Sequence, residues 1–493
     1  MELNDKSLLD EIIYLGKHNR YFINFVHGKD INIDIDIMDK LIDIHSSLSK
    51  KNADLYSQEE KIKELWIKLV DKSIKCLRYF DEREPFKKNT NKKPETYRIE
   101  ELKSYFDRFS SFEGMLYGSN NKYRDHVIHV FRTWFLGVYV LLTKSSNTRM
   151  IDKIELDGVV GNTKFFFNPN IYERLSMWTL ISLCHDLGYP LERREEIINK
   201  TEKMMTIFFP NANITMTYNN ISGVHDESFR NIVKFISSKI ERSAVEINSR
   251  HKTKYSSRIQ SKYYNKIYKS LESFSHGIIS AIVLFRSLEY FLESDFSIEG
   301  DYGYSKNDAS QFYIRREILR AIAMHTCINA YHIKTTTFPF LLILCDELQE
   351  WDRRTFKDFY LGGSTTENRV DLNLNKLNKN EVCICESLTY KKAPDYIKLF
   401  DEYIKQYEKY KKIFRDGLDT NYRKFSFNKV IKVNNEEIIF EIDISKKQDS
   451  KFIIQYKTNT AKNKYDSIIR KMIDGKYEFK VNKDGYFVYR RKY

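Results

Sequence analysis

Apolar residues recur at spacings of three and four along most of the first 350 positions, a pattern that predicts amphipathic helices. Within residues 1–80 the strongest such face comprises Ile62, Leu65, Trp66, Leu69, Ile74 and Leu77. The same periodicity predicts helices over residues 123–142, 171–187, 228–247, 318–325 and 338–351. Residues 250–268 are a basic, tyrosine-rich connection, which we interpret as an exposed helical face. In the apolar helix that opens at His276, the small residues Gly277, Ser280 and Ala281 would let a neighbouring helix approach closely.

Beyond about residue 380 the pattern changes to alternation with a period of two, which predicts strands. Residues 430–433 and 438–444 flank Asn434 and Asn435 as one hairpin, residues 452–456 add a strand, and residues 477–481 and 487–489 form a second hairpin. A lysine-rich helix is expected over residues 396–414, and a hairpin-like insert over residues 153–167. We therefore expect a mainly α fold. A helical N-terminal layer (1–115) would precede a helical core with a short β insert (116–380), followed by a small basic α+β domain (381–493).

Composition places the 493-residue chain among globular proteins, because 42% of its residues are hydrophobic and 14% are aromatic. The longest apolar runs, residues 278–285 and 338–345, are much shorter than the ~20 residues of a membrane span. With no secretory or transit signal at the start of the sequence, we expect a cytoplasmic protein that makes no membrane contact. The six cysteines lie mostly in apolar runs, which indicates reduced core thiols and no structural zinc site.

The net charge of +14 is concentrated at one end of the sequence. Residues 391–493 hold 26 Lys or Arg against 15 Asp or Glu. A basic face of this kind binds nucleic acid or other polyphosphates, although a lysine-rich composition also arises in an AT-rich genome. Nucleic acid is thus one candidate partner of the C-terminal domain.

An adjacent imidazole and carboxylate, His185 and Asp186, end the apolar run that begins at Ile181. A carboxylate beside such a run must be solvated, paired or bound to metal, since burying it bare costs several kcal/mol or more. Gly188 and Pro190 follow closely and predict the end of the helix. The pair is therefore expected at a helix end, pointing into a site.

Two further segments carry residue types that suit the same site. His126 and His129 share one face of the helix predicted over residues 123–142, so both imidazoles can point inward. Asp346 ends the apolar run 338–345. Imidazole and carboxylate are ligands for divalent metal ions.

The order His, His-Asp, Asp resembles the signature of the HD-domain metal-dependent phosphohydrolases over roughly residues 120–355. The resemblance implies an HD-type helical core that binds one or two divalent ions, which can be Mn, Mg, Fe, Ni or Zn. It implies His126, His185, Asp186 and Asp346 as ligands, with His126 favoured over His129; His129 stays open as ligand or general acid. Relatives with two metals add histidines between the His-Asp pair and the last Asp, which gives His325 the role of an added ligand and His276 a catalytic or ligand role. Ordinary core histidines are the alternative for both.

Other candidates lie close to these motifs in sequence. His225 and Asp226 form a second adjacent pair, which we expect in a polar loop; they are either a general acid with its orienting carboxylate or a surface pair. Substrate phosphate needs cations, and four arginines follow the motifs closely: Arg193, Arg194, Arg353 and Arg354. Their alternative is an exposed structural role.

Three functions remain open. The first, which we favour, is hydrolysis of deoxynucleoside triphosphates to deoxynucleoside and tripolyphosphate, implied by the resemblance of the long core with extra helical layers to that branch. Its relatives often form nucleotide-activated homo-oligomers, and the activity would serve nucleotide-pool control or phage defence. The second is a phosphodiesterase or nuclease acting on cyclic nucleotides or single-stranded nucleic acid. The third is a non-catalytic nucleotide sensor or scaffold.

Overall fold

A computed structural model describes most of the helical part of the chain and the strands that follow it. The described residues are 2–27, 37–50, 54–81, 99–119, 123–145, 148–154, 169–208, 224–247, 250–292, 306–327, 337–349, 351, 353, 366–373, 381–390, 405, 424–433, 436–445, 451–456, 477–481 and 487–491. The described structure is mainly helical, as the apolar periodicity predicts.

Among the described residues, helices dominate up to residue 348 and strands dominate from residue 366 onward. The α-helices are α1 (Asp5–His18), α2 (Arg20–His27), α3 (Met38–Leu48), α4 (Glu59–Asp81), α5 (Ile99–Ser119), α6 (Val127–Leu142), α7 (Met150–Lys153), α8 (Ile171–Cys184), α9 (Tyr189–Glu192), α10 (Arg194–Phe208), α11 (Val224–Ser237), α12 (Ser261–Glu272), α13 (His276–Ser287), α14 (Lys306–Met324) and α15 (Phe338–Leu348). Short 3-10 turns are η2 (Tyr56–Gln58) and η3 (Glu289–Phe291). The strands are β1 (Glu2–Leu3), β2 (Lys144–Ser145), β3 (Thr148–Arg149), β4 (Ser238–Ile247), β5 (Arg250–Ile259), β6 (Thr366–Asn373), β7 (Glu381–Tyr390), β8 (Lys424–Val433), β9 (Glu436–Ser445), β10 (Lys451–Tyr456), β11 (Tyr477–Val481) and β12 (Phe487–Arg491).

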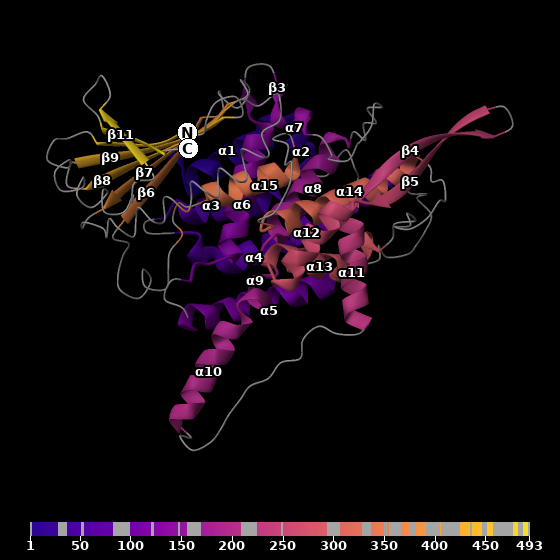
Figure 1. Ribbon diagram of the computed structural model, residues 1–493, viewed down its shortest axis with the longest axis horizontal. Helices are drawn as coiled ribbons and strands as arrows, with labels where there is room; N and C mark the ends of the chain where they lie inside the picture. The colour runs from indigo at the N-terminus through magenta and orange to yellow at the C-terminus, as the bar shows by residue number, and fades with distance from the viewer. Residues whose placement is uncertain are drawn as a thin grey trace.

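A six-stranded sheet lies at one side of the helical body, and the hairpin of β4 and β5 extends from the opposite side (Figure 1). The sheet order is β1-β6-β7-β8-β9-β10, with β7 and β8 parallel and the other neighbours antiparallel. Its first strand comes from the N-terminus, because Glu2 pairs with Asp371. The N-terminal and C-terminal parts of the chain therefore share one sheet.

The helices α6 and α8 cross closely in the centre of the body, and every residue of α6 is buried. Gly137 makes the close approach possible, since a Cβ atom there would lie 1.9 Å from the Trp178 ring. Trp178 Nε1 donates to the Trp134 carbonyl at 3.2 Å, and Trp134 Nε1 donates to Thr179 Oγ1 at 3.0 Å. These bonds satisfy the buried indole N–H groups and fix the two helices that carry the candidate site.

A buried ion pair fastens α1 onto the same core. Arg132 Nε and Nη2 donate to the two carboxylate oxygens of Asp5 at 2.8 and 2.7 Å. Trp351 Nε1 donates to Asp5 Oδ1 at 2.9 Å. Because a bidentate pair of this kind fixes geometry as well as charge, α1 is held against α6 and the segment that follows α15.

The hairpins predicted near the C-terminus are present. Val433 pairs with Glu436 across Asn434 and Asn435, β10 pairs with β9, and Val481 pairs with Phe487 in the β11–β12 ribbon. The close approach predicted at Gly277 is also present, because a Cβ atom there would lie 2.5 Å from Thr326 Oγ1.

Two helix predictions are wrong. The helix predicted over residues 228–247 ends at Ser237, and the next ten residues form β4. Residues 250–259 of the predicted basic helical face form β5, which pairs with β4 along its whole length; helix α12 begins only at Ser261. The alternation in this segment, with Ile240 and Tyr255 both buried, was obscured by its many charged residues.

Two predictions fall largely on residues that are not described, namely most of the insert 153–167 and all but residue 405 of the helix 396–414. Within the described helices, none is both long enough and apolar enough to cross a membrane.

Candidate metal centre

The His-Asp pair lies where α8 ends, as its sequence context predicts. Helix α8 runs to Cys184 and His185 is its C-cap residue, while Pro190 stands in the first turn of α9. The last carbonyls of a helix lack backbone partners; two side chains supply donors to those of α8, and a third donates to the turn that follows. His185 Nδ1 donates to Ser182, Trp66 Nε1 to Leu183 and Tyr105 Oη to Leu187, at 2.7, 3.0 and 2.7 Å. The turn that presents the pair is therefore rigid.

Two carboxylates hold the buried start of α6, which carries His129. Glu113 accepts from the backbone N–H groups of His126 and Val127, and Asp125 Oδ1 accepts from those of Ile128 and His129. Tyr56 Oη donates to Asp125 Oδ2 at 2.6 Å. Because all four of these donors are satisfied, a helix N-terminus can lie in the interior next to the site.

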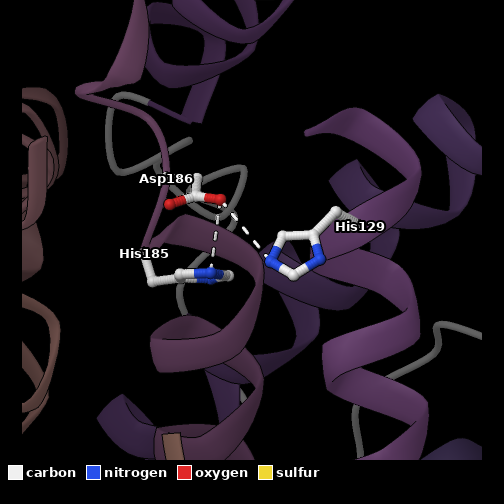
Figure 2. Close-up of side chains that lie close together, drawn as sticks. All are labelled: His129, His185 and Asp186. Carbon is white, nitrogen blue, oxygen red and sulfur yellow. Dashed lines mark ion pairs between the residues drawn. The ribbon is translucent and has the colours of Figure 1, made fainter. Parts of the chain in front are cut away.

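Four side chains from α6, α8 and α15 meet at the end of α8. Figure 2 shows His129 and His185 directed at Asp186, whose Oδ2 lies 3.7 Å from His129 Nε2 and 3.4 Å from His185 Nε2. Asp346 Oδ1 lies 2.9 Å from His129 Nε2 and 3.8 Å from His185 Nε2. Two imidazoles and two carboxylates thus converge from segments up to 217 residues apart.

The other oxygen of Asp186 faces a second pair of histidines. His276 Nε2 and His325 Nε2 lie 3.4 and 3.7 Å from Asp186 Oδ1, and their ring centroids are 5.0 Å apart. Gly188 lets the start of α9 reach α13, because a Cβ atom there would lie 2.4 Å from the His276 carbonyl oxygen. Asp186 therefore stands between two histidine pairs.

Three groups have ligand atoms within 4.8 Å of one another: His129, His185 and Asp186; His185, His325 and Asp346; and Asp186, His276 and His325. These buried His and Asp groups could hold a divalent metal ion. Asp186 belongs to two of the groups through different oxygen atoms. One carboxylate is therefore shared by two of the candidate ligand groups.

Each of the four histidines is fixed through its Nδ1 atom. The acceptors for His129, His185, His276 and His325 are the Gln349 amide oxygen, the Ser182 carbonyl, the Glu192 carboxylate and the Ile322 carbonyl. A ring that donates from Nδ1 presents its Nε2 lone pair to a metal. The buried Nε2 atoms of His185 and His325 have no hydrogen-bond partner among the described residues. The donor set fits a metal ion.

The protonation of the cluster is set by its own charges. Burial raises the pKa of Asp186 and Asp346, but the surrounding imidazoles outweigh it and hold both well below their usual range. Burial lowers the pKa of His185, but the two carboxylates outweigh that effect and raise it to about 9. For His325, burial wins and the pKa is lowered. Both carboxylates are therefore ionised near neutral pH and available to a cation.

Among the described side chains of the cluster, exposure differs from one side to the other. The side chains of His129 and His185 are completely buried and that of His325 is 2% exposed, whereas those of His276 and Asp346 are 21% and 24% exposed. Solvent therefore reaches the cluster past His276 and Asp346.

His126, favoured from sequence as the first ligand, is held differently from His129. Its Nδ1 lies 2.9 Å from Tyr123 Oη, and its ring stacks on Tyr189 at a centroid distance of 3.8 Å. It belongs to none of the ligand groups found among the described residues. Burial lowers the pKa of His126 well below its usual value, although the nearby Asp186 opposes this. It is a neutral imidazole beside the cluster, and His129 takes the inward position one helical turn later.

The remaining candidates divide according to their distance from the cluster. The charge of Arg353 helps to lower the pKa of His126, so this guanidinium lies near the site. Arg193 donates to Tyr189 Oη at 3.1 Å and pairs with Glu196, while Arg194 lies over the Phe274 ring at 4.2 Å from its centroid. Arg354 falls outside the described residues. His225 and Asp226 lie in the first turn of α11 instead of a loop.

Three residues that shape the site were not singled out from sequence: Gln349, Glu192 and Tyr189. Gln349 follows Asp346 by three positions, a spacing that places both on one helical face and could have indicated a shared role. Glu192 lies six residues after Asp186, but its partner His276 is 84 residues away, and no sequence signal links them. Tyr189 stands between Gly188 and Pro190, and the helix-ending signal of those two residues indicates no role for its side chain.

Comparison with protein-family models, with curated proteins and with solved structures found no match to this chain.

Proposed function

We propose that this chain is a metal-dependent phosphohydrolase with a binuclear centre built on an HD-type helical core. The observation that carries the proposal is the orientation of four histidines. Each donates from Nδ1 to an oxygen acceptor and turns its Nε2 atom toward Asp186 or Asp346. Core histidines without a ligand have no reason to share this arrangement. The order of the motifs, which resembles the HD signature, supports the same proposal.

His129, His185, Asp186 and Asp346 would hold the first ion, and His276, His325 and Asp186 the second. Divalent ions of this kind supply an acidified water and neutralise phosphate charge. The buried side of the site, lined by His129, His185 and His325, excludes bulk water and strengthens the electrostatic interactions there. Substrate enters past His276 and Asp346.

Two groups beside the centre serve the substrate. The neutral ring of His126, whose Nδ1 is held by Tyr123, leaves its Nε2 atom as a proton acceptor. Arg353 brings a positive charge close enough to act on His126, which suits a group that binds a phosphate oxygen.

The first substrate class is the deoxynucleoside triphosphates, hydrolysed to deoxynucleoside and tripolyphosphate. The support is the resemblance of the long helical core with added layers to that branch. This activity would serve nucleotide-pool control or phage defence, and by the same resemblance we propose a nucleotide-activated homo-oligomer.

The second substrate class is phosphodiesters, cyclic or polymeric. A specific observation favours it: the second pair of histidines on Asp186, which provides for a second ion. Two ions clamp both the attacking and the leaving oxygen of an in-line displacement. The excess of Lys and Arg in residues 391–493 supports nucleic acid as a further partner.

Product analysis distinguishes these classes. The protein is incubated with Mn²⁺ against the four deoxynucleoside triphosphates, singly and mixed, and against cyclic nucleotides and single-stranded DNA. Tripolyphosphate with deoxynucleoside identifies the first class, whereas nucleoside monophosphates from cyclic or polymeric substrates identify the second. Failure to release any product from these substrates, with metal bound, would contradict the proposed function.

A further inference from the structure

The four histidines differ in the group that fixes them. The hydrogen-bond acceptors of the His129, His185 and His325 rings are neutral amide or carbonyl oxygens. Of the four rings, only that of His276 donates to a carboxylate, which belongs to Glu192. His276 is also the most exposed of the four. The most solvent-accessible ligand thus has the strongest acceptor.

One oxygen of Glu192 makes both contacts with His276. Oε2 accepts from the backbone N–H at 2.8 Å and from ring Nδ1 at 2.5 Å. His276 is the first residue of α13, and Ser275 before it makes no side-chain cap. Glu192 therefore caps α13 from another helix while it sets the orientation of the ring.

The same short segment carries Glu192 and the bridging Asp186. Gly188, between them, donates its N–H to Ser280 Oγ on α13 at 2.7 Å, and a Cβ atom there would lie 2.7 Å from the Ser280 nitrogen. The segment is thereby pressed against the first turn of α13. His276 Nε2 is left 3.4 Å from Asp186 Oδ1.

We propose that Glu192 is the positioning residue of the second ion: its carboxylate holds His276 with Nε2 toward Asp186 and raises the affinity of the His276–His325–Asp186 site alone. This inference rests on the proposed binuclear centre. A carboxylate behind a ligand histidine orients the ring, fixes its tautomer and makes it a stronger ligand. The site built on His129, His185 and Asp346 has its own acceptors and does not depend on Glu192. The two ions should therefore respond differently to the loss of this one carboxylate.

The test measures Mn²⁺ binding to the full-length protein by calorimetry and by elemental analysis after dialysis. The wild-type chain should bind two ions. In Glu192→Ala the first ion should bind as before and the second about 10- to 100-fold more weakly, the range for loss of such a partner. Glu192→Gln, which retains an acceptor oxygen without the charge, should fall between the two. The matched control is Glu195→Gln, an exposed carboxylate three residues later that should leave both ions unchanged.

A spectroscopic readout separates positioning from general damage. The two proteins are compared by electron paramagnetic resonance at one or more equivalents of Mn²⁺ per chain. The wild type should give the spectrum of a spin-coupled Mn²⁺ pair, and Glu192→Ala that of an isolated ion. Unchanged affinity for the second ion in both variants would overturn the proposal, and so would equal weakening of both ions. A wild-type chain that binds a single ion overturns it while leaving a mononuclear phosphohydrolase intact. A chain that binds no ion overturns the proposed function as well.

Discussion

Asp186 Oδ1 lies 3.4 Å from His276 Nε2, although the two residues are 90 positions apart and come from different helical segments. The other oxygen, Oδ2, faces His129 and His185 instead. One carboxylate therefore joins two sets of ligands, and its loss should disable both.

We expect Asp186→Asn to abolish binding of both Mn²⁺ ions and all hydrolysis, because the amide keeps the shape but removes the shared negative charge. Metal content and product release are measured on the same sample, with far-ultraviolet circular dichroism as a check of folding. A folded variant that still turned over substrate would sink the assignment of this site.

Substitution of His126 and substitution of His129 should have different effects on metal binding and turnover. His129→Ala removes a group directed at both carboxylates and should cost metal binding 10-fold or more. His126→Ala should keep both ions and reduce turnover roughly 10²- to 10⁴-fold, the usual cost of losing a group that transfers a proton. Metal titrations and turnover rates of the two variants decide the matter; loss of metal in His126→Ala with retention in His129→Ala would reverse the roles.

The sequence alone could not predict which of His126 and His129 points into the cluster. Spacing places His126 and His129 on one face of a helix, but it cannot show that the helix begins only at Val127. His126 is therefore its cap residue, held by Tyr123, while His129 lies in the first turn and points inward. Which ring reaches the cluster depends on the contact of Glu113 with the start of α6 and on that of Tyr56 with Asp125, and no local pattern encodes these contacts.

Other features were accessible from sequence for clear physical reasons. The end of α8 at Cys184 follows from glycine and proline next to the His-Asp pair, since both act locally. The hairpin at Asn434 and Asn435 follows from turn chemistry between alternating segments. By contrast, the sequence did not predict the β4–β5 hairpin. Its strands contain few apolar residues, and charged residues precede and follow these in the sequence, which weakens the period-two signal.

The metal-free cluster should show a definite pH dependence. The pKa of His185 is raised in the folded chain from 6.5 to about 9, because its carboxylate neighbours outweigh burial. The protonated ring therefore contributes stability that is fully present below about pH 6.5 and is lost as pH rises through about 9. Denaturant unfolding of the metal-free protein between pH 6 and 10 should show this loss, and His185→Gln should flatten it. A curve with equal slope in the variant would contradict the role of His185.

Mn²⁺ must displace the same proton, so its binding should release a proton between pH 6.5 and 9. Affinity should rise by up to about tenfold per pH unit in that window and level off above it. Calorimetry in buffers of different ionisation enthalpy counts the released protons. Binding without proton release at pH 7 would show that His185 is neutral before the ion arrives.

The contact between α13 and α14 can be tested with a single methyl group. A Cβ atom at Gly277 would lie 2.8 Å from the Ile322 carbonyl oxygen and 3.0 Å from His325 Cε1. Backbone oxygen cannot move aside cheaply, so Gly277→Ala should push α13 away from α14 and separate His276 from His325. We expect a loss of about 1–3 kcal/mol in the free energy of unfolding and selective weakening of the second Mn²⁺ ion.

Gly114→Ala is the matched control, because Gly114 also lies within a helix and a Cβ atom there meets nothing within 4 Å. That change should leave both ions in place and stabilise the protein by roughly 0.5–1 kcal/mol, the helix propensity gained on replacing glycine by alanine. Denaturant unfolding and Mn²⁺ titration of both variants give the comparison. If Gly277→Ala behaved like Gly114→Ala in both measurements, the close approach that brings His276 and His325 together would not be needed for the second ion.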